Sequence, residues 1–279
     1  MLEQQYDISG AIVFWSLQPT PYQKVKGIFD LLGLSGCVPN PRTDQSALEH
    51  SIKAVCGTKN KAVMSRKRPK RNGVELVEIQ RNELRNDYIT SFGAKVVEGR
   101  VKTDYGYADE YRLTEEYLRS KALLTCTAVG QAMAAAVAKY DGMKGFAKPG
   151  VFYIPEYHLQ DWQHLCSLIE AAQEGNETTA IRAAMDEGTA RAIRDNLSKE
   201  VQEQAAKLLD DVSKGTLNAA QLRVREDQAV ALVERVDLYA NILGEALEGL
   251  RNVAAVAKNA AFSAELQASA SCGPVTVCV

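Results

Sequence analysis

The chain has 279 residues, of which 46% are hydrophobic and 24% are charged, and its formal net charge is -2 at pH 7. This composition excludes a wholly disordered chain, and the length allows one large domain or two small ones. The first ten residues have no basic cluster, and the longest uncharged stretch is Ala-rich and short for a membrane span of roughly 20 apolar residues. We therefore expect a cytoplasmic protein with no membrane partner.

The first part of the chain mixes helix and strand patterns. Apolar residues with a period of two, separated by glycines, predict an antiparallel meander, whereas caps and apolar residues at helical spacing predict the helices. In chain order we expect a strand over 10–17, helices over 21–32 and 44–56, three or four antiparallel strands over 61–111, a helix over 114–140, a strand over 151–154 and a helix over 155–169.

The last hundred residues are different, because nearly all of them favour helix. Gly215 divides them into two expected helices, 178–213 and 218–268, and the short turn favours antiparallel pairing. The predicted fold class is thus α+β, with a mainly antiparallel sheet and packed helices followed by a long helical hairpin. The expected domains are an α+β head over 1–175, the hairpin over 176–268 and a flexible tail over 269–279.

Apolar residues along the second of these helices recur in alternating steps of four and three, which is a heptad seam. Such a seam needs a partner helix, and both the preceding helix of the same chain and a second subunit remain open as partners. The predicted oligomer or partner interface consists of Val233, Val236, Ala240, Leu243, Leu247, Leu250, Ala254 and Ala257.

A basic stretch is the sharpest charge feature, since residues 51–74 contain no acidic residue. A proline and an Asn-Gly pair predict an exposed loop there, and clustered cations can lie along phosphates. The candidate nucleic-acid-binding residues are Lys61, Arg66, Lys67, Arg68, Lys70 and Arg71. A solvated loop and a contact with an acidic protein surface are the alternatives.

Known catalytic motifs are not found in the sequence, and the three histidines and six cysteines have no metal-ligand spacing. We predict no catalytic residue, metal or cofactor, and we expect free thiols. Asp104, Asp109 and Glu110 form an acidic cluster that could bind a divalent cation, with a solvated loop as the alternative.

Several short segments occur in an order that resembles an uncharacterised protein family of bacteria, archaea and their phages and plasmids. The resemblance covers roughly residues 10–172 and is carried by Phe14-Trp15-Ser16, Thr20-Pro21, Gly33-Leu34, Pro39-Asn40-Pro41, Ser46-Ala47-Leu48 and Gly150-Val151-Phe152-Tyr153-Ile154-Pro155. It implies no activity and no site residues, but it favours a phage or mobile-element context.

Three hypotheses for function follow. The first is a non-enzymatic interaction or assembly protein that forms a homo-oligomer, or binds a protein partner, through its C-terminal helical hairpin. The second is a nucleic-acid-binding protein that uses the basic loop 61–71. The third, an enzyme, rests only on acidic residues near the sheet.

Overall fold

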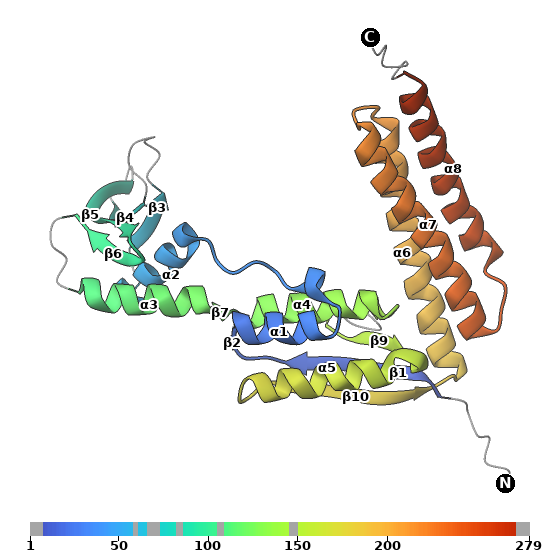
Figure 1. Cartoon of the computed structure of the whole chain (residues 1–279), viewed down its shortest axis with the longest axis horizontal. Coiled ribbons are helices and arrows are strands. Elements are labelled where there is room, and N and C mark those ends of the chain that lie inside the picture. The colour runs from blue at the N-terminus through green and yellow to red at the C-terminus, as the bar shows by residue number, and fades with distance from the viewer. Residues whose placement is uncertain are drawn as a thin grey trace, which may run out of the picture. The chain divides into compact units, whose positions relative to one another are not determined.

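The computed structural model describes residues 8–57, 61–65, 73–81, 86–104, 109–144 and 150–271, and it confirms the α+β class (Figure 1). Within these residues the elements are β1 (Ile8–Ser16), β2 (Thr20–Pro21), α1 (Tyr22–Leu31), η1 (Ser35–Cys37), α2 (Asp44–Cys56), β3 (Lys61–Ser65), β4 (Val74–Arg81), β5 (Asn86–Val97), β6 (Arg100–Thr103), α3 (Glu110–Ala122), β7 (Leu123–Leu124), α4 (Cys126–Lys139), β8 (Met143–Lys144), β9 (Phe152–Pro155), η2 (Glu156–His158), α5 (Leu159–Ala172), β10 (Glu177–Ala184), α6 (Glu187–Ser213), α7 (Ala219–Leu243) and α8 (Glu248–Ser271).

Contacts between backbone positions group the chain into two compact units. The first unit takes residues 1–14, 137–163 and 179–279, and the second takes 15–136 and 164–178. None of the helices in the described ranges is both long enough and apolar enough to span a membrane.

The first unit contains most of a four-stranded sheet with the order β10-β1-β9-β8. β1 and β9 pair antiparallel, with Ala11 opposite Ile154. Gly10 is required at this pairing, because a Cβ there would lie 2.1 Å from the carbonyl oxygen of Ile154. Residues 177–184 form strand β10, which corrects the prediction that a helix begins at 178. Thr178, Thr179 and Ile181 are β-branched, and pairing with β1 outweighs the helix propensity of the neighbouring alanines.

Helices α6, α7 and α8 complete the first unit, where a two-helix hairpin was predicted. Asn218 caps α7 in a capping box with Gln221. The expected single helix 218–268 is wrong, because Gly244 adopts a left-handed conformation (φ 64°) that ends α7. α7 and α8 therefore form a second antiparallel hairpin and pack against each other (Figure 1).

The core of the three helices is formed by the apolar face of each. It contains Ile193, Leu197 and Val201 from α6, Leu232, Val236 and Tyr239 from α7, and Ala254 and Ala257 from α8. Between residues 248 and 268 of α8 only alanines are fully buried, which allows the helix backbone to approach the other two helices closely.

The second unit contains the predicted meander, with the strand order β3-β4-β5-β6 and antiparallel pairing throughout. α2 and α3 share a core with this sheet, in which Leu48, Ile52 and Leu113 meet Leu76 and Phe92. The N-cap of α2 is Thr43, and its side chain accepts a hydrogen bond from the Ser46 N–H.

The long helix expected over 114–140 is divided in two. α3 ends at Ala122, and Leu123–Leu124 forms strand β7, which pairs with β2. The Thr125 hydroxyl then accepts a hydrogen bond from the Ala128 N–H at the start of α4 (3.1 Å). Leu123 and Leu124 favour helix, but they form a strand here because pairing with β2 satisfies their backbone hydrogen-bonding groups.

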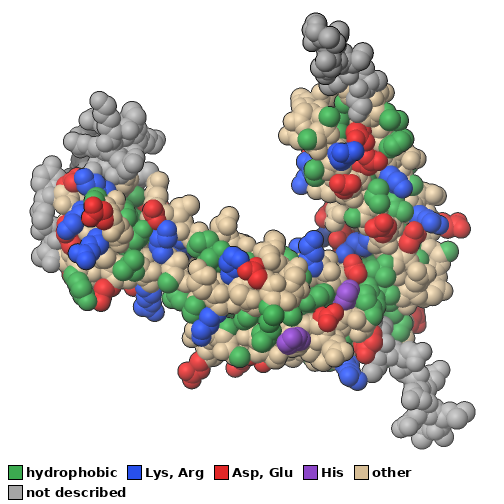
Figure 2. Space-filling model, in the orientation of Figure 1, with side chains coloured by type: hydrophobic (Ala, Val, Ile, Leu, Met, Phe, Trp, Pro, Cys, Tyr) green, Lys and Arg blue, Asp and Glu red, His purple; other side chains and the backbone are tan. Residues whose placement is uncertain are grey.

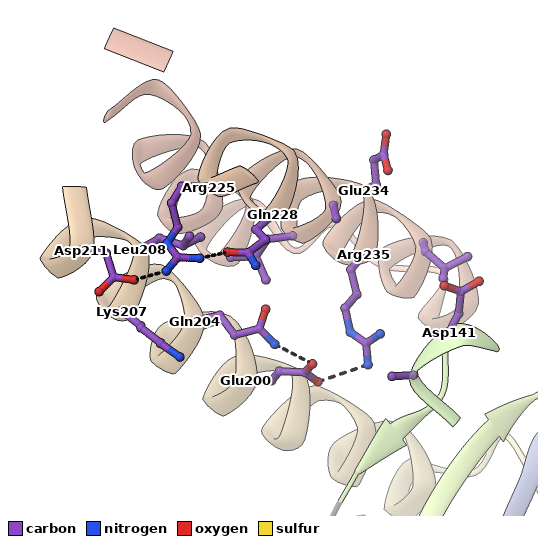
Figure 3. A pocket seen from close by; sticks show the side chains of 14 residues that line it. Asp141, Glu200, Gln204, Lys207, Leu208, Asp211, Arg225, Gln228, Glu234 and Arg235 are labelled. Carbon is purple, nitrogen blue, oxygen red and sulfur yellow. Dashed lines mark hydrogen bonds and ion pairs between the residues drawn. The ribbon is translucent and has the colours of Figure 1, made fainter. Parts of the chain in front are cut away.

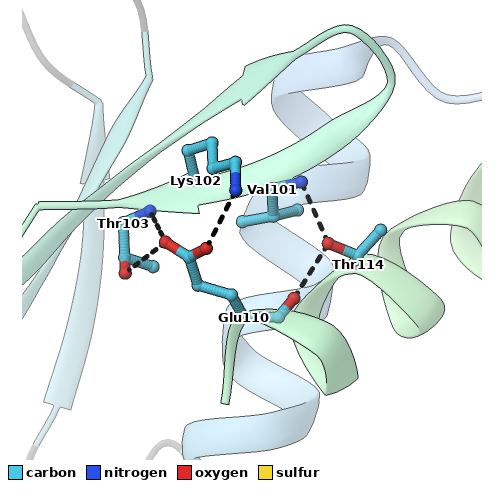
Figure 4. A network of polar contacts seen from close by, with 5 residues as sticks. All are labelled: Val101, Lys102, Thr103, Glu110 and Thr114. Carbon is cyan, nitrogen blue, oxygen red and sulfur yellow. Dashed lines mark hydrogen bonds and ion pairs between the residues drawn. The ribbon is translucent and has the colours of Figure 1, made fainter. Parts of the chain in front are cut away.

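Glu110 joins α3 to the edge strand β6 (Figure 4). Its carboxylate accepts hydrogen bonds from the Thr103 N–H (2.7 Å) and hydroxyl (2.9 Å), and Lys102 lies 3.4 Å away. One turn later the Thr114 hydroxyl accepts a hydrogen bond from the Val101 N–H at 3.0 Å. The Glu110 carboxylate is occupied by these contacts, which make it a structural group.

We expect Glu110→Gln to flatten the acid sensitivity of the second unit. The Thr103 N–H lowers the pKa of Glu110 from its ordinary value of 4.5, so its stabilisation is present above that pH and is lost as the pH falls through the lowered pKa. Denaturant unfolding at a series of pH values below neutrality measures this. Glu115→Gln, at an exposed position of the same helix, should retain the acid sensitivity; equal curves for Glu110→Gln and the parent chain would contradict the assignment.

Candidate functional site

A cleft of about 700 Å³ lies between α6 and α7 (Figure 3). Two ion pairs cross it, from Arg225 to Asp211 (2.9 Å) and from Arg235 to Glu200 (3.2 Å). Because 225 meets 211 and 235 meets 200, these pairs fix the antiparallel register of the two helices. Between them the cleft is lined by Gln204, Lys207, Leu208, Gln228, Ala231 and Leu232.

The polar groups of this cleft mostly satisfy one another. Gln228 accepts a hydrogen bond from Arg225 (3.0 Å), and Gln204 donates one to Glu200 (2.9 Å). The Nε atoms of Arg225 and Arg235 have no acceptor among the described residues, but both are buried and beyond reach of a ligand in this conformation. Ligand sites are usually apolar with a few converging polar groups, so this cleft is better described as a clamp between two helices.

Arg235 also helps to hold the turn at Asp141 and Gly142. It donates to the Gly142 carbonyl oxygen (2.7 Å), and the Tyr239 hydroxyl donates to the Asp141 carbonyl oxygen (2.6 Å). Asp141 has a positive φ of 53°, which is uncommon for a residue other than glycine. Burial raises the pKa of Tyr239, so this hydroxyl stays protonated and remains a donor.

Tyr239→Phe should lower the free energy of unfolding of the first unit by about 1–2 kcal/mol, because the Asp141 carbonyl oxygen loses its donor in a buried place. Denaturant unfolding followed by far-UV circular dichroism measures this change. The matched control is Tyr157→Phe, which removes a longer hydrogen bond (3.3 Å) from a tyrosine that is 52% exposed. A loss as large for Tyr157→Phe would contradict the role given to Tyr239.

The predicted interface residues lie within the first unit and face its core. Val236, Ala254 and Ala257 are almost fully buried, and Val233, Leu243, Leu247 and Leu250 pack partly buried against the same cluster. Ala240 is half-buried. The heptad seam is thus filled by helices of its own chain.

The opposite side of α8 has the surface that the sequence reading overlooked. Every exposed residue from 252 to 267 is uncharged. Four of them are large and apolar, namely Val253 (37% exposed), Val256 (57%), Phe262 (47%) and Leu266 (54%). We call this surface the outer face of α8 and define it as Asn252, Val253, Ala255, Val256, Asn259, Ala260, Phe262, Ser263, Leu266 and Gln267.

Two charged residues of α8, Arg251 and Glu265, lie at the edge of this face and reach towards α7. Arg251 pairs with Asp237 of α7 (3.1 Å), and Glu265 lies 3.8 Å from Arg223 of α7. Figure 2 shows hydrophobic side chains at the surface of the C-terminal helices. The sequence could have indicated this uncharged face, because between Arg251 and the end of α8 only Lys258 and Glu265 are charged.

The basic residues Arg66, Lys67, Arg68, Lys70 and Arg71 lie outside the described residues. The strands on either side of them are described: β3, which begins at Lys61, pairs with β4 so that Ser65 is opposite Val74. Along the chain, this segment therefore connects two paired strands.

Two of the three carboxylates of the acidic cluster have partners of their own in the fold. Glu110 binds Thr103, whereas the Asp109 carboxylate lies 4.0 Å from Arg112. Among the described side chains no group of three or more His, Cys, Asp or Glu residues is placed to hold a metal ion.

One polar cluster of the second unit was not expected from the sequence. The Ser120 hydroxyl lies 3.1 Å from Nδ1 of His50, and Arg42 donates to the same hydroxyl. A serine beside a histidine can form a nucleophile and base. However, Ser120 is only 5% exposed, and the Glu116 carboxylate lies 3.9 Å from the same ring nitrogen, so the relay of a catalytic triad is not formed.

The fold and these surfaces define an α+β protein with three packed C-terminal helices, one of which has an uncharged outer face. The model of DUF6744, a family of unknown function, matches residues 10–271, and the chain belongs to this family. The match confirms the resemblance to an uncharacterised family and extends it through α8. No curated protein and no solved structure matches the chain.

Proposed function

We propose that this protein is a non-enzymatic interaction or assembly protein that binds a protein partner through the outer face of α8. The observation that supports this best is that α8 has two different sides. One side is buried against α6 and α7, whereas the other, the outer face, is exposed, uncharged and partly apolar. Surface helices of globular proteins usually carry charged residues on the side away from the core. A contiguous exposed apolar surface commonly marks an interaction site.

The size of the outer face suits a helix as partner. From Asn252 to Gln267 it extends about 22 Å along α8, at 1.5 Å per residue. Alanine and serine lie between the larger side chains, so a second helix could approach closely. A phage or mobile-element context and a cytoplasmic location belong to the same proposal, and the family resemblance supports the first of these.

The experiment is site-specific photo-cross-linking in cells that encode the protein. A photoreactive phenylalanine analogue at Phe262 should give a discrete cross-linked protein species. The same analogue at Gln202, an exposed residue of α6, is the matched control and should give none. Absence of any cross-linked species at 262, with the protein present at its normal level, would rule out the proposal.

The second candidate function is nucleic-acid binding by Lys61, Arg66, Lys67, Arg68, Lys70 and Arg71. It is supported by the absence of acidic residues from 51 to 74 in a chain whose net charge is -2. Because the overall charge does not attract phosphate, binding would depend on this segment alone.

A further inference from the structure

We infer that the outer edge of strand β10 binds residues 275–279 of a second copy of this chain as an added β-strand. The inference goes beyond the proposed function, because it concerns another surface and does not need the outer face of α8. Three properties of the chain carry it: an open strand edge, a segment that favours strand, and a distance that separates the two within one copy.

β10 has one neighbouring strand only, because it is the terminal strand in the order β10-β1-β9-β8. Its middle is uncovered: Thr179, Ala180, Ile181 and Arg182 are all exposed, whereas every residue of the inner strand β9 is buried. Strand edges that face solvent are usually protected by proline, by lysine, by a bulge or by a covering element. β10 contains neither proline nor lysine, and its apolar Ile181 is 54% exposed.

The backbone groups that point outward from β10 can be assigned from one hydrogen bond. The Thr178 N–H donates to the Glu170 carboxylate (2.8 Å) and therefore points away from β1. Because alternate residues of a strand direct their N–H and C=O groups to the same side, those of Ala180 and Arg182 also point outward. No hydrogen bond to these four groups is found in the part of the chain that the structure describes. They are the groups that an added strand would pair with.

A comparison with β6 shows that an open edge is not the rule in this chain. β6 is a terminal strand of the other four-stranded sheet. The N–H groups of Val101 and Thr103 donate to side chains of α3 at 3.0 and 2.7 Å, so they are not free to pair with a further strand. In β10 one such contact is made, at Thr178, and the backbone groups of Ala180 and Arg182 are left for another chain.

Residues 275–279 have the sequence Val-Thr-Val-Cys-Val and lie outside the described residues. Four of the five are β-branched, which favours strand. The run has no charge, no proline and no glycine, which is the composition of segments that add to strand edges. Gly273 and Pro274 separate it from α8 in the sequence, and neither favours helix. Its alternate valines share one face of an added strand and can cover Ile181.

Within one copy this segment cannot reach β10. α6 starts directly after β10, at Glu187, and its 27 residues extend about 40 Å. Arg225 of α7 pairs with Asp211 near the far end of α6, and Glu265 of α8 lies beside Arg223. The C-terminal end of α8 is therefore level with the far end of α6, away from β10 (Figure 1). Residues 272–279 span at most about 28 Å when fully extended, so the segment can pair only with β10 of another copy.

Each copy then offers one open edge and donates one strand, so the contact is heterologous. Such contacts form rings or open chains, as an assembly protein requires. A strand of five residues buries much less than the roughly 800 Å² per partner of a standard interface. We therefore expect a dissociation constant weaker than about 10 µM.

Fluorescence anisotropy tests the pairing with a labelled peptide of residues 273–279, in which Cys278 is replaced by Ser. The protein is the full chain with Val277→Pro, which cannot donate its own segment because proline lacks the backbone N–H. The peptide should bind this chain. Ala180→Pro, added to it, should weaken binding at least tenfold, because an outward N–H is removed.

Ala180→Val is the matched control, since valine keeps the N–H and favours strand; binding should stay within twofold. Proline is tolerated where the N–H of an edge strand faces solvent, and circular dichroism verifies that both variants keep the parent's thermal stability. No binding of the peptide at millimolar protein concentration, or equal losses for Ala180→Pro and Ala180→Val, would overturn the inference.

Sedimentation equilibrium over a concentration series tests the assembly of the full chain. The parent should associate as its concentration rises, whereas Ala180→Pro and Val277→Pro should each sediment as monomers. A one-to-one mixture of these two variants should form a dimer and nothing larger, because one variant keeps the open edge and the other keeps the strand. A mixture that stays monomeric, or a parent that is a strict monomer at millimolar concentration, contradicts the inference.

Phe262→Glu separates this contact from the outer face of α8. The variant should associate as the parent does, because Phe262 lies on α8 and not on β10. Loss of association in this variant would assign the contact to α8 and exclude β10. Conversely, a photoreactive analogue at Phe262 that captures nothing excludes the proposed function, while association through β10 would still be seen in the centrifuge.

Discussion

Ala257→Leu should destabilise the first unit by about 1–3 kcal/mol, the usual cost of overpacking a filled core. Ala257 is 1% exposed and its neighbours Ala254 and Ala261 are fully buried, so three alanines set the distance between α8 and the other helices. A leucine at 257 must displace α8 or distort its neighbours. Denaturant unfolding followed by far-UV circular dichroism gives the change in the free energy of unfolding.

Ala260→Leu is the matched control, since it makes the same change on the same helix at a half-buried position of the outer face. Its effect should stay within about 0.5 kcal/mol, as for most surface substitutions. If the two variants lost equal stability, the distinction between the inner and outer faces of α8 would be wrong, and with it the structural basis of the proposed function.

Removal of the basic segment should abolish salt-dependent nucleic-acid binding, if the second candidate function is correct. With one phosphate neutralised by each of Arg66, Lys67, Arg68, Lys70 and Arg71, log K against log salt has a slope of about -4.5 on duplex DNA. Affinity then falls on the order of 500-fold between about 50 and 200 mM salt. Replacing all five residues by Ala should bring the slope close to zero.

Fluorescence anisotropy with labelled duplex DNA, single-stranded DNA and RNA over a salt series measures this slope. The control variant replaces three exposed cations by Ala, namely Arg191 and Lys199 of α6 and Lys214 directly after this helix. It should bind with the parent's slope. No binding by the parent chain at low salt, or equal losses in both variants, would leave the basic segment without a role in nucleic-acid recognition.

These experiments separate two surfaces that lie in different units. The basic segment belongs to the second unit and the outer face of α8 to the first. A variant of one should therefore leave the other's measurement unchanged: the five-Ala variant should keep the cross-linked species at position 262.

The sequence by itself determined the α+β class, the antiparallel meander and which residues of the last helices are buried. Period-two and heptad patterns indicate which side chains face a core, and this holds even where the predicted ends of the helices are wrong. Val236, Ala254 and Ala257 were placed on a seam, and all three are buried. The pattern continued unbroken from Leu243 to Leu247 because α7 and α8 face the same core from either side of their turn.

Only the tertiary structure decided where the helices end and what fills the seam. Gly244 ends α7 because the reversal lets α8 pack on α6 and α7, whereas Gly249 lies within α8. Residues 123–124 and 177–184 became strands because other strands were available to pair with them. Periodicity shows that a face is buried but not by what. The predicted interface residues pack against helices of their own chain, and the outer face of α8 could be recognised only once the packing of α8 against α6 and α7 was known.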